Sequence, residues 1–220
     1  MKARVKRVTK QRNGFNSGIL ITVIYTRLRN NLIKQAEGVK KMGKKVFIVS
    51  STFRKNGNSE ILAEAFAKGA REAGNEVVKI DLREKELKFC TGCMYCADGK
   101  KCVLDDFVNG IYDEVQNSDV LVFATPVYYY SVSGQLKTFL DRLNPLYARK
   151  NRFKKVYLLA SSADDDKSAM DGAITAVKGW TDCFDGVSLG GVVYGTGVEK
   201  AGEINATKAV SEAYETGKNV

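Results

Sequence analysis

The chain has 220 residues, of which 44% are hydrophobic, and its formal net charge is +10. This length and apolar content are enough for one sizeable hydrophobic core. Histidine is absent, which excludes Ser-His-Asp and Cys-His nucleophilic catalysis and histidine-ligated zinc. Chemistry in this chain must therefore use cysteine, carboxylates, backbone amides or a bound cofactor.

The positive charge is concentrated at the N-terminus. Residues 1–41 contain eleven Lys or Arg residues and one acidic residue, so they carry the whole net charge, and the rest of the chain is neutral overall. A neutral body gives no support to nucleic-acid binding. The apolar stretch at 19–25 is too short for a membrane span, which needs about 20 apolar residues. We expect a basic extension over 1–43, with translation starting at Met42, and a folded domain over 44–220.

The first half of the expected domain begins with an apolar run at 46–50, which predicts a buried strand. A polar loop at 52–58 precedes an amphipathic helix that starts at Ser59, and Gly74 marks its end. The alternating segment 76–82 predicts a second strand. A cysteine-rich loop follows this strand.

The second half continues the alternation of helices and strands. The patterns predict a helix from Asp105-Asp106 to about Asn117, a central strand at 119–124 and a loop at 125–130. A helix over 134–143, a strand at 155–160 and a polar loop at 161–167 are expected next. A helix to about Asp182, a strand at 187–194 and a closing helix over 202–217 complete the chain. Five strands separated by helices predict an α/β fold with a doubly wound parallel sheet.

The polar loop after the first strand lies where such a sheet binds its ligand. Thr52, Arg54, Asn58 and Ser59 offer hydroxyls, a guanidinium and an amide beside free N–H groups at a helix N-terminus. This combination is typical of a phosphate site. An ordinary helix cap at Asn58 or Ser59 is the alternative, and neither a P-loop nor a dinucleotide-binding glycine pattern follows this strand.

Four cysteines, Cys90, Cys93, Cys96 and Cys102, form a C-x2-C-x2-C-x5-C run. Four thiolates this close suit a [4Fe–4S] cluster, with a zinc ion or an ordered loop of reduced thiols as alternatives. Clustered cysteines with an odd total favour a reducing, cytoplasmic location. We expect the fifth, Cys183, to be a core residue, and the acidic run 164–166 to be a solvated loop.

Several segments together resemble a known family. The run 50–59, Thr125-Pro126-Val127-Tyr128, the helix start at 133–137, Asp141-Arg142 and the cysteine run are similar to flavodoxin-like NAD(P)H-dependent FMN reductases, in the branch that includes the iron–sulfur flavoproteins. The resemblance covers roughly residues 44–197. It implies a flavodoxin-like sheet of order 2-1-3-4-5. One departure is Phe53, where many relatives have proline.

The resemblance implies non-covalent FMN as the cofactor. Its phosphate is expected on Thr52, Arg54, Asn58 and Ser59, and its ring against Pro126, Val127, Tyr128 and Tyr129. The flavin itself performs the hydride chemistry, so no side chain is expected to act as a catalytic acid or base.

The implied activity is electron transfer from NAD(P)H through FMN to free flavin, a quinone or another small acceptor, by an enzyme that forms a homo-oligomer. The first alternative is an iron–sulfur flavoprotein that receives electrons from ferredoxin through a [4Fe–4S] cluster. Because the cysteine loop leaves the second strand at the flavin edge, this cluster is expected near the flavin of its own or a neighbouring subunit. The second alternative is an adaptor whose basic arm binds nucleic acid or a membrane, although the body predicts neither partner.

Overall fold

A computed structural model describes residues 43–220 of the chain. The predictions made for the basic extension, including its apolar stretch at 19–25, lie outside the described residues. Among residues 43–220, no helix has both the length and the apolar content needed to cross a bilayer.

The described domain is built on one twisted parallel sheet. Its strands lie in the order β2 (Glu76–Asp81), β1 (Lys45–Ser50), β3 (Val120–Tyr128), β5 (Lys155–Ser161) and β6 (Ser188–Gly195). The short β4 (Ser131–Val132) pairs antiparallel with the end of β3. The predicted flavodoxin-like order is confirmed, since the fourth and fifth predicted strands are β5 and β6.

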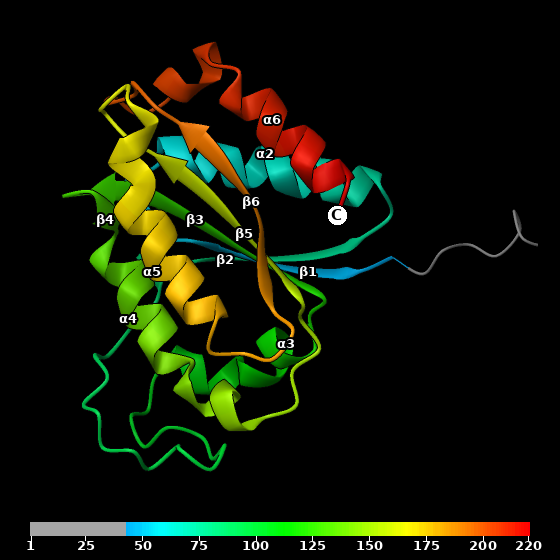
Figure 1. The fold of residues 1–220 in the computed structure, drawn as a ribbon, viewed down its shortest axis with the longest axis vertical. Coiled ribbons are helices and arrows are strands. Elements are labelled where there is room, and N and C mark those ends of the chain that lie inside the picture. The colour runs from blue at the N-terminus through cyan, green and yellow to red at the C-terminus, as the bar shows by residue number, and fades with distance from the viewer. Residues whose placement is uncertain (1–42) are drawn as a thin grey trace, which may run out of the picture. The chain divides into compact units, whose positions relative to one another are not determined.

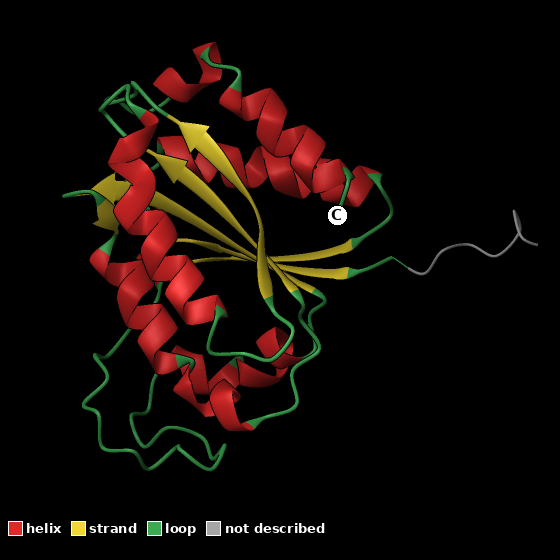
Figure 2. Ribbon diagram, viewed as in Figure 1, coloured by secondary structure: helices red, strands yellow, loops and turns green. Residues whose placement is uncertain are grey.

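Helices cover both faces of the sheet (Figures 1 and 2). One face is covered by α2 (Asn58–Glu72) and α6 (Ala209–Lys218), and the other by α3 (Tyr112–Gln116), α4 (Gly134–Arg142) and α5 (Asp171–Thr181). Because side chains alternate along a strand, Val46 and Ile48 belong to the α2 and α6 core, whereas Phe47 belongs to the opposite core. The apolar runs read from the sequence are thus buried on both sides.

Short 3-10 helices complete the chain. They are η1 (Leu82–Glu84), η2 (Phe107–Gly110), η3 (Asn144–Ala148), η4 (Lys167–Met170) and η5 (Glu203–Ala206). The helix predicted from Asp105-Asp106 is therefore η2 followed by α3, and the closing helix is η5 followed by α6.

The predicted loop at 125–130 is partly wrong. The strand β3 continues to Tyr128, and Tyr129 and Tyr130 form a two-residue turn into β4. Their φ angles of 48° and 62° match a type I′ turn, which normally uses Asn-Gly because both positions need positive φ. Two tyrosines in this conformation strain the backbone, and such strain is concentrated at functional sites.

Candidate functional site

A cavity of about 240 Å³ opens at the carboxyl ends of the central strands. Six predicted cofactor residues line it, namely Thr52, Arg54, Asn58, Pro126, Val127 and Tyr128. The structure therefore brings the loop after β1 and the end of β3 together. Two other predicted residues do not line the cavity: Ser59 is buried, and Tyr129 is fully exposed at the tip of the turn.

The phosphate end of this cavity lies at the start of α2. The first N–H groups of a helix have no intrahelical partner and favour an anion. The Ser59 hydroxyl is buried there and forms no hydrogen bond. A buried hydroxyl without a partner is unusual, and a phosphate oxygen would supply one. The local chemistry therefore fits the phosphate of FMN.

A glycine allows the phosphate loop to fold back on itself. A Cβ atom added at Gly57 would lie 2.6 Å from Oγ1 of Thr52, well inside contact distance. Thr52 is itself 3% exposed, so it has no room to move aside. Glycine, which has no Cβ atom, therefore fits at this position, and Gly57 belongs to the polar loop that the sequence predicted as the phosphate site.

The side chain of Asn58 connects the loop to another part of the domain. Its Nδ2 donates to the Lys200 carbonyl at 3.0 Å, and its Oδ1 accepts from the N–H groups of Gly202 and Ile204 at 3.1 and 3.2 Å. The amide thus tethers the segment after β6. Phosphate binding by Asn58 would therefore use its backbone N–H, not the side chain that the sequence suggested.

The guanidinium of Arg54 also has a partner within the chain. Its Nη1 donates to the Glu199 carbonyl at 2.6 Å, in an exposed position. Glu199 lines the same cavity, so the guanidinium lies at the cavity edge. A direct contact between Arg54 and the phosphate remains a prediction.

The other end of the cavity is apolar and aromatic. Pro126 and Val127 are half-buried, and Tyr128 is 46% exposed. Phe53 follows Thr52 in the chain and is also exposed, but it does not line the cavity. A flat flavin ring needs an apolar wall of this kind, so these residues fit the expected ring. Contact between the ring and Tyr128 or Tyr129 remains a prediction.

The remaining lining residues were missed by the sequence analysis. They come from the end of β5 and from the segments that follow β5 and β6, and they are Ser161, Ala163, Val198, Glu199 and Ala201. The topology offered a signal for them, since every loop at the carboxyl edge of a doubly wound sheet approaches the ligand. The acidic run 164–166 is a solvated loop, in which Asp166 caps η4 by accepting from the Ser168 N–H at 2.9 Å.

Helix α4 begins at the cofactor cavity. The Ser133 hydroxyl caps it by accepting the Leu136 N–H and donates to the Ser51 hydroxyl at 2.9 Å. Ser51 follows β1 directly, next to Thr52. From this contact the nine residues of α4 extend about 13 Å, away from the carboxyl edge of the sheet.

At its far end, α4 holds the cysteine loop through Arg142. This guanidinium forms an ion pair with Asp106, and both side chains are fully buried. It also donates to the Lys88 carbonyl at 2.9 Å and the Leu104 carbonyl at 3.0 Å. Because Lys88 and Leu104 flank the cysteine run, a single side chain closes the base of the loop.

The sequence predicted only part of the role of Asp106. Its Oδ1 accepts the Val108 N–H at 3.1 Å, so the predicted helix cap is confirmed. The ion pair was not foreseen, because Arg142 is 36 residues away in the chain. Burial alone would lower the pKa of Arg142, but hydrogen bonding and charge from Asp106 outweigh it and the pKa is raised.

A second cavity, of about 410 Å³, lies between the cysteine loop and the ends of α4 and α5. Cys90, Cys93, Cys96 and Cys102 all line it, so the four predicted metal ligands are brought to one place. The buried Cys96 sulfur accepts from Nδ2 of Asn144 at 3.3 Å. Figure 1 shows the loop as the long irregular segment below the sheet, beside α4.

The donor set of this cavity is four thiols without imidazole. Hydrogen bonds from the Tyr95 backbone and then the Thr91 side chain lower the pKa of the Cys93 thiol, and the thiolate is the form that binds metals. Within residues 43–220, no three cysteine or carboxylate side chains are placed to hold one ion. One zinc needs every sulfur within about 2.3 Å of a point, whereas the thiolates of a [4Fe–4S] cluster bind different irons. The donor chemistry fits the cluster better.

The two cavities lie at opposite ends of α4 and share no lining residue. Within one chain the two sites are therefore separated by the length of α4, and proximity of a cluster to the flavin of a neighbouring subunit stays a prediction. The cysteine loop does leave β2 at the flavin edge, but it then follows α4 toward the opposite edge of the sheet.

The prediction for Cys183 is also wrong. It is exposed in the turn after α5, and it lines the cysteine cavity. Its neighbours Trp180 and Phe184 pack on the core instead, with ring centroids 4.6 Å apart. The prediction assumed that the helix continues through Cys183 and turns this residue toward the core with its neighbours. The helix ends at Thr181, so helical spacing does not place the Cys183 side chain in the core.

Proteins similar to this chain include an iron–sulfur flavoprotein of Archaeoglobus fulgidus, 36% identical over 104 residues, which are 47% of each chain. The chain thus spans about half the length of that relative. A Bacillus subtilis protein named as an NAD(P)H-dependent FMN-containing oxidoreductase is 25% identical over 77% of this chain and 94% of its own. The solved NAD(P)H:quinone oxidoreductase of Methanothermobacter marburgensis has a TM-score of 0.62 at 18% identity, covering 80% of this chain and 96% of that one, and it shows the shared fold.

The family sequence pattern described as NADPH-dependent FMN reductase matches residues 44–197. The match runs from the start of β1 to just beyond β6, so it includes the cysteine loop and every lining residue of the cofactor cavity except Val198, Glu199 and Ala201. The chain therefore belongs to the NADPH-dependent FMN reductase family of flavodoxin-like oxidoreductases.

Proposed function

We propose that this chain is an iron–sulfur flavoprotein, an enzyme that binds FMN and one [4Fe–4S] cluster. The proposal rests mainly on one observation: all four cysteines of the C-x2-C-x2-C-x5-C run line the same cavity. This cavity lies at the C-terminal end of α4, and the N-terminal end of α4 lies at the cofactor cavity. Three relatives named as iron–sulfur flavoproteins are 34–36% identical over 102–107 residues. This supports the alternative from the sequence over a reductase with flavin alone.

The protein's own residues would hold the flavin and leave the redox chemistry to it. Free N–H groups at the start of α2 and the Ser59 hydroxyl would bind the phosphate. The apolar wall from Pro126 to Tyr128 would orient the ring. When bound, FMN supplies two-electron exchange with NAD(P)H and one-electron exchange with a cluster. No described side chain is required as a catalytic acid or base.

The acceptor would be a small molecule that reaches an open face of the flavin, such as a quinone or free flavin. The cavity supports this because it opens to solvent beside the exposed Tyr128. The likeness to a solved NAD(P)H:quinone oxidoreductase agrees with it. We also propose a homo-oligomer, since Tyr129 and Tyr130 expose a strained aromatic turn beside the site.

The decisive experiment measures both cofactors. Protein purified anaerobically with iron and sulfide should contain about four irons per chain together with bound FMN. Cys93→Ser should lose the iron and keep the FMN, because no phosphate or ring residue lies in the cysteine loop. Cys183→Ser is the matched control, since Cys183 lines the same cavity outside the run, and it should keep both cofactors. Wild-type protein with FMN and no iron would reject the cluster.

A plain NAD(P)H-dependent FMN reductase is the second candidate. Two observations favour it: within residues 43–220 the cysteines are not gathered around one ion, and the Bacillus subtilis relative is similar over most of its length. It predicts FMN with four free thiols in the run, and an unchanged NAD(P)H oxidation rate in Cys93→Ser.

The folded part from 44 to 220 would be sufficient for cofactor binding, and residues 1–43 would be dispensable for it. The described residues support this because residues 43–220 form one compact unit. Free thiols and a cluster both require a reducing environment, so we propose a cytoplasmic location.

A further inference from the structure

A basic run lies beside the cysteine cavity. Residues 149–155 read Arg-Lys-Asn-Arg-Phe-Lys-Lys, with five cations in seven residues and no acid. The sequence analysis missed it because the charges from 42 to 220 cancel when they are summed. In the fold these residues run from the end of η3 to the first residue of β5, at the amino edge of the sheet and away from the cofactor cavity.

Three cations of this run have no acidic partner within the described part of the chain. Arg152 pairs with Asp119 and Arg149 with Asp113, but Lys150, Lys154 and Lys155 form no ion pair there. All three lysines are exposed. The Lys154 ammonium donates to the Asp185 carbonyl at 3.1 Å, which fixes its position without neutralising its charge.

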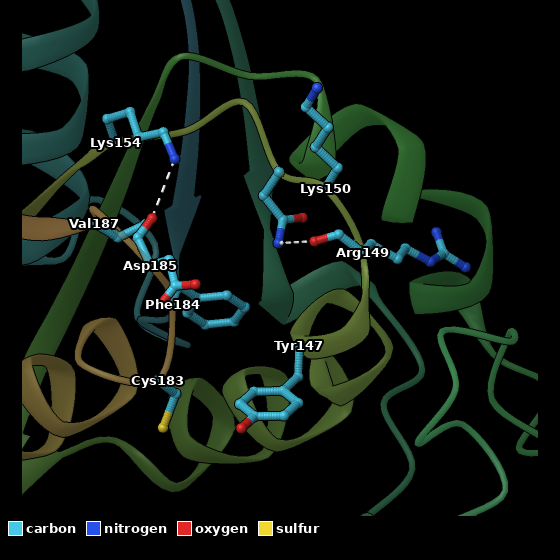
Figure 3. A pocket seen from close by; sticks show the side chains of 9 residues that line it. Tyr147, Arg149, Lys150, Lys154, Cys183, Phe184, Asp185 and Val187 are labelled. Carbon is cyan, nitrogen blue, oxygen red and sulfur yellow. Dashed lines mark hydrogen bonds between the residues drawn. The ribbon is translucent and has the colours of Figure 1, made fainter.

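The run borders a cavity of about 400 Å³, shown in Figure 3. Tyr147, Cys183 and Phe184 line both this cavity and the cysteine cavity. The basic surface and the proposed cluster site are therefore separated by one layer of side chains. No residue of the basic cavity lines the cofactor cavity, so this surface is not the place where a nicotinamide would reach the flavin.

The arrangement of the charges indicates the kind of partner. In Figure 3 the side chains of Lys150 and Arg149 point away from Lys154. Cations that diverge cannot surround one small anion such as phosphate. They do present a broad positive surface, which fits a broad acidic surface on another protein.

We propose that residues 149–155 form the docking surface for an acidic electron-carrier protein that exchanges single electrons with the cysteine cavity. The inference rests on the proposed function. Each reduced carrier would give one electron to a cluster held by the four cysteines and would leave oxidised by one electron. Two carriers would therefore supply the two electrons that reduce the flavin, with protons taken from water.

The test uses the full chain loaded with FMN and iron, and a reduced [4Fe–4S] ferredoxin of net negative charge as the probe. Stopped-flow absorbance follows reduction of the protein at low ionic strength. Lys150→Glu/Lys154→Glu should slow this reduction about tenfold, the lower end of electrostatic steering. The difference should shrink at about 0.5 M salt, where charges are screened within a few ångströms.

The matched control is Lys68→Glu/Lys208→Glu, which makes the same change of charge on the α2 and α6 side of the sheet, where both lysines are exposed. It should leave the rate within about twofold of wild type, because Lys68 lies in α2 and Lys208 just before α6, on the opposite side of the sheet from the cysteine cavity that the docking surface adjoins. Residues 1–41 are present in every variant, so their charge is common to all.

Two further readouts separate this proposal from the proposed function. Iron content and the rate of reduction by dithionite should be the same in all variants, because the lysines do not bind the cluster. Low iron in the wild type would reject the proposed cluster, and with it the proposed function. Equal slowing in both variants, or none in either, would overturn the docking surface. The docking surface would also be overturned if ferredoxin did not bind but duplex DNA or anionic vesicles bound through the same lysines.

Discussion

Replacing Asp106 by alanine should destabilise the domain strongly, because the buried guanidinium of Arg142 would lose its counter-charge. Both side chains have no exposed surface, and removing one member of a buried ion pair costs about 3–5 kcal/mol. Asp106 also caps η2 at Val108, which adds about 1 kcal/mol. The carbonyls of Lys88 and Leu104 still accept from Arg142 and offset part of the loss. We therefore expect a net loss of about 4 kcal/mol, a large share of the 5–15 kcal/mol typical of a domain.

Urea unfolding followed by circular dichroism measures this loss. With a slope of about 2 kcal/mol per molar, the midpoint should fall by about 2 M. Arg142→Met and the double variant complete a double-mutant cycle. The summed losses of unfolding free energy in the two single variants should exceed the loss in the double variant by at least about 2 kcal/mol. Asp182→Ala removes an exposed pair with Lys178 and should change stability by less than about 0.5 kcal/mol. A loss below about 1 kcal/mol for Asp106→Ala, or additive single losses, would refute the reasoning.

Three further outcomes are expected. Arg54→Ala/Ser59→Ala should weaken FMN binding about 100-fold, because two contacts to a charged group are lost. Fluorescence titrations should show riboflavin binding unchanged, and an equal loss of affinity for both ligands would contradict the phosphate site. Burial raises the pKa of Tyr112 from 10 to about 12, so its unfolded form loses the proton first and this residue should contribute a fall in stability of about 2–3 kcal/mol as pH rises through that window. The fall measured from urea midpoints should be smaller by that amount in Tyr112→Phe, because Tyr157 and Tyr214, whose pKa values are also raised, still contribute. Tyr129→Asn/Tyr130→Gly should raise the unfolding free energy by about 1–2 kcal/mol by relieving the positive φ angles, and a lower melting temperature would argue against strain in the turn.

The sequence was sufficient for features that depend on local pattern. Continuous apolar runs such as 119–124 predicted buried strands, and their alternation with helices predicted the doubly wound sheet. The polar loop at 52–58 was placed at the ligand edge because that edge follows from topology alone. Asp106 was recognised as a cap because a cap acts within one helical turn.

Only the tertiary structure decided which partner each side chain has. The amide of Asn58 contacts Gly202 and Ile204, more than 140 residues away, so its tethering role has no local signal. Arg142 was seen only as part of a family resemblance, and its burial against Asp106 depends on how α4 packs on the cysteine loop.

The position of the cysteines has the same explanation. Their spacing in one loop was visible in the sequence, but the cavity that they line is completed by Leu140 of α4 and by Cys183 beyond α5. The basic run at 149–155 reaches that cavity through Tyr147 and Phe184. Periodicity reports which face of an element is buried, whereas contacts between distant elements depend on packing. For that reason the sequence predicted the cofactor edge of this protein, and the fold decided what adjoins its cysteines.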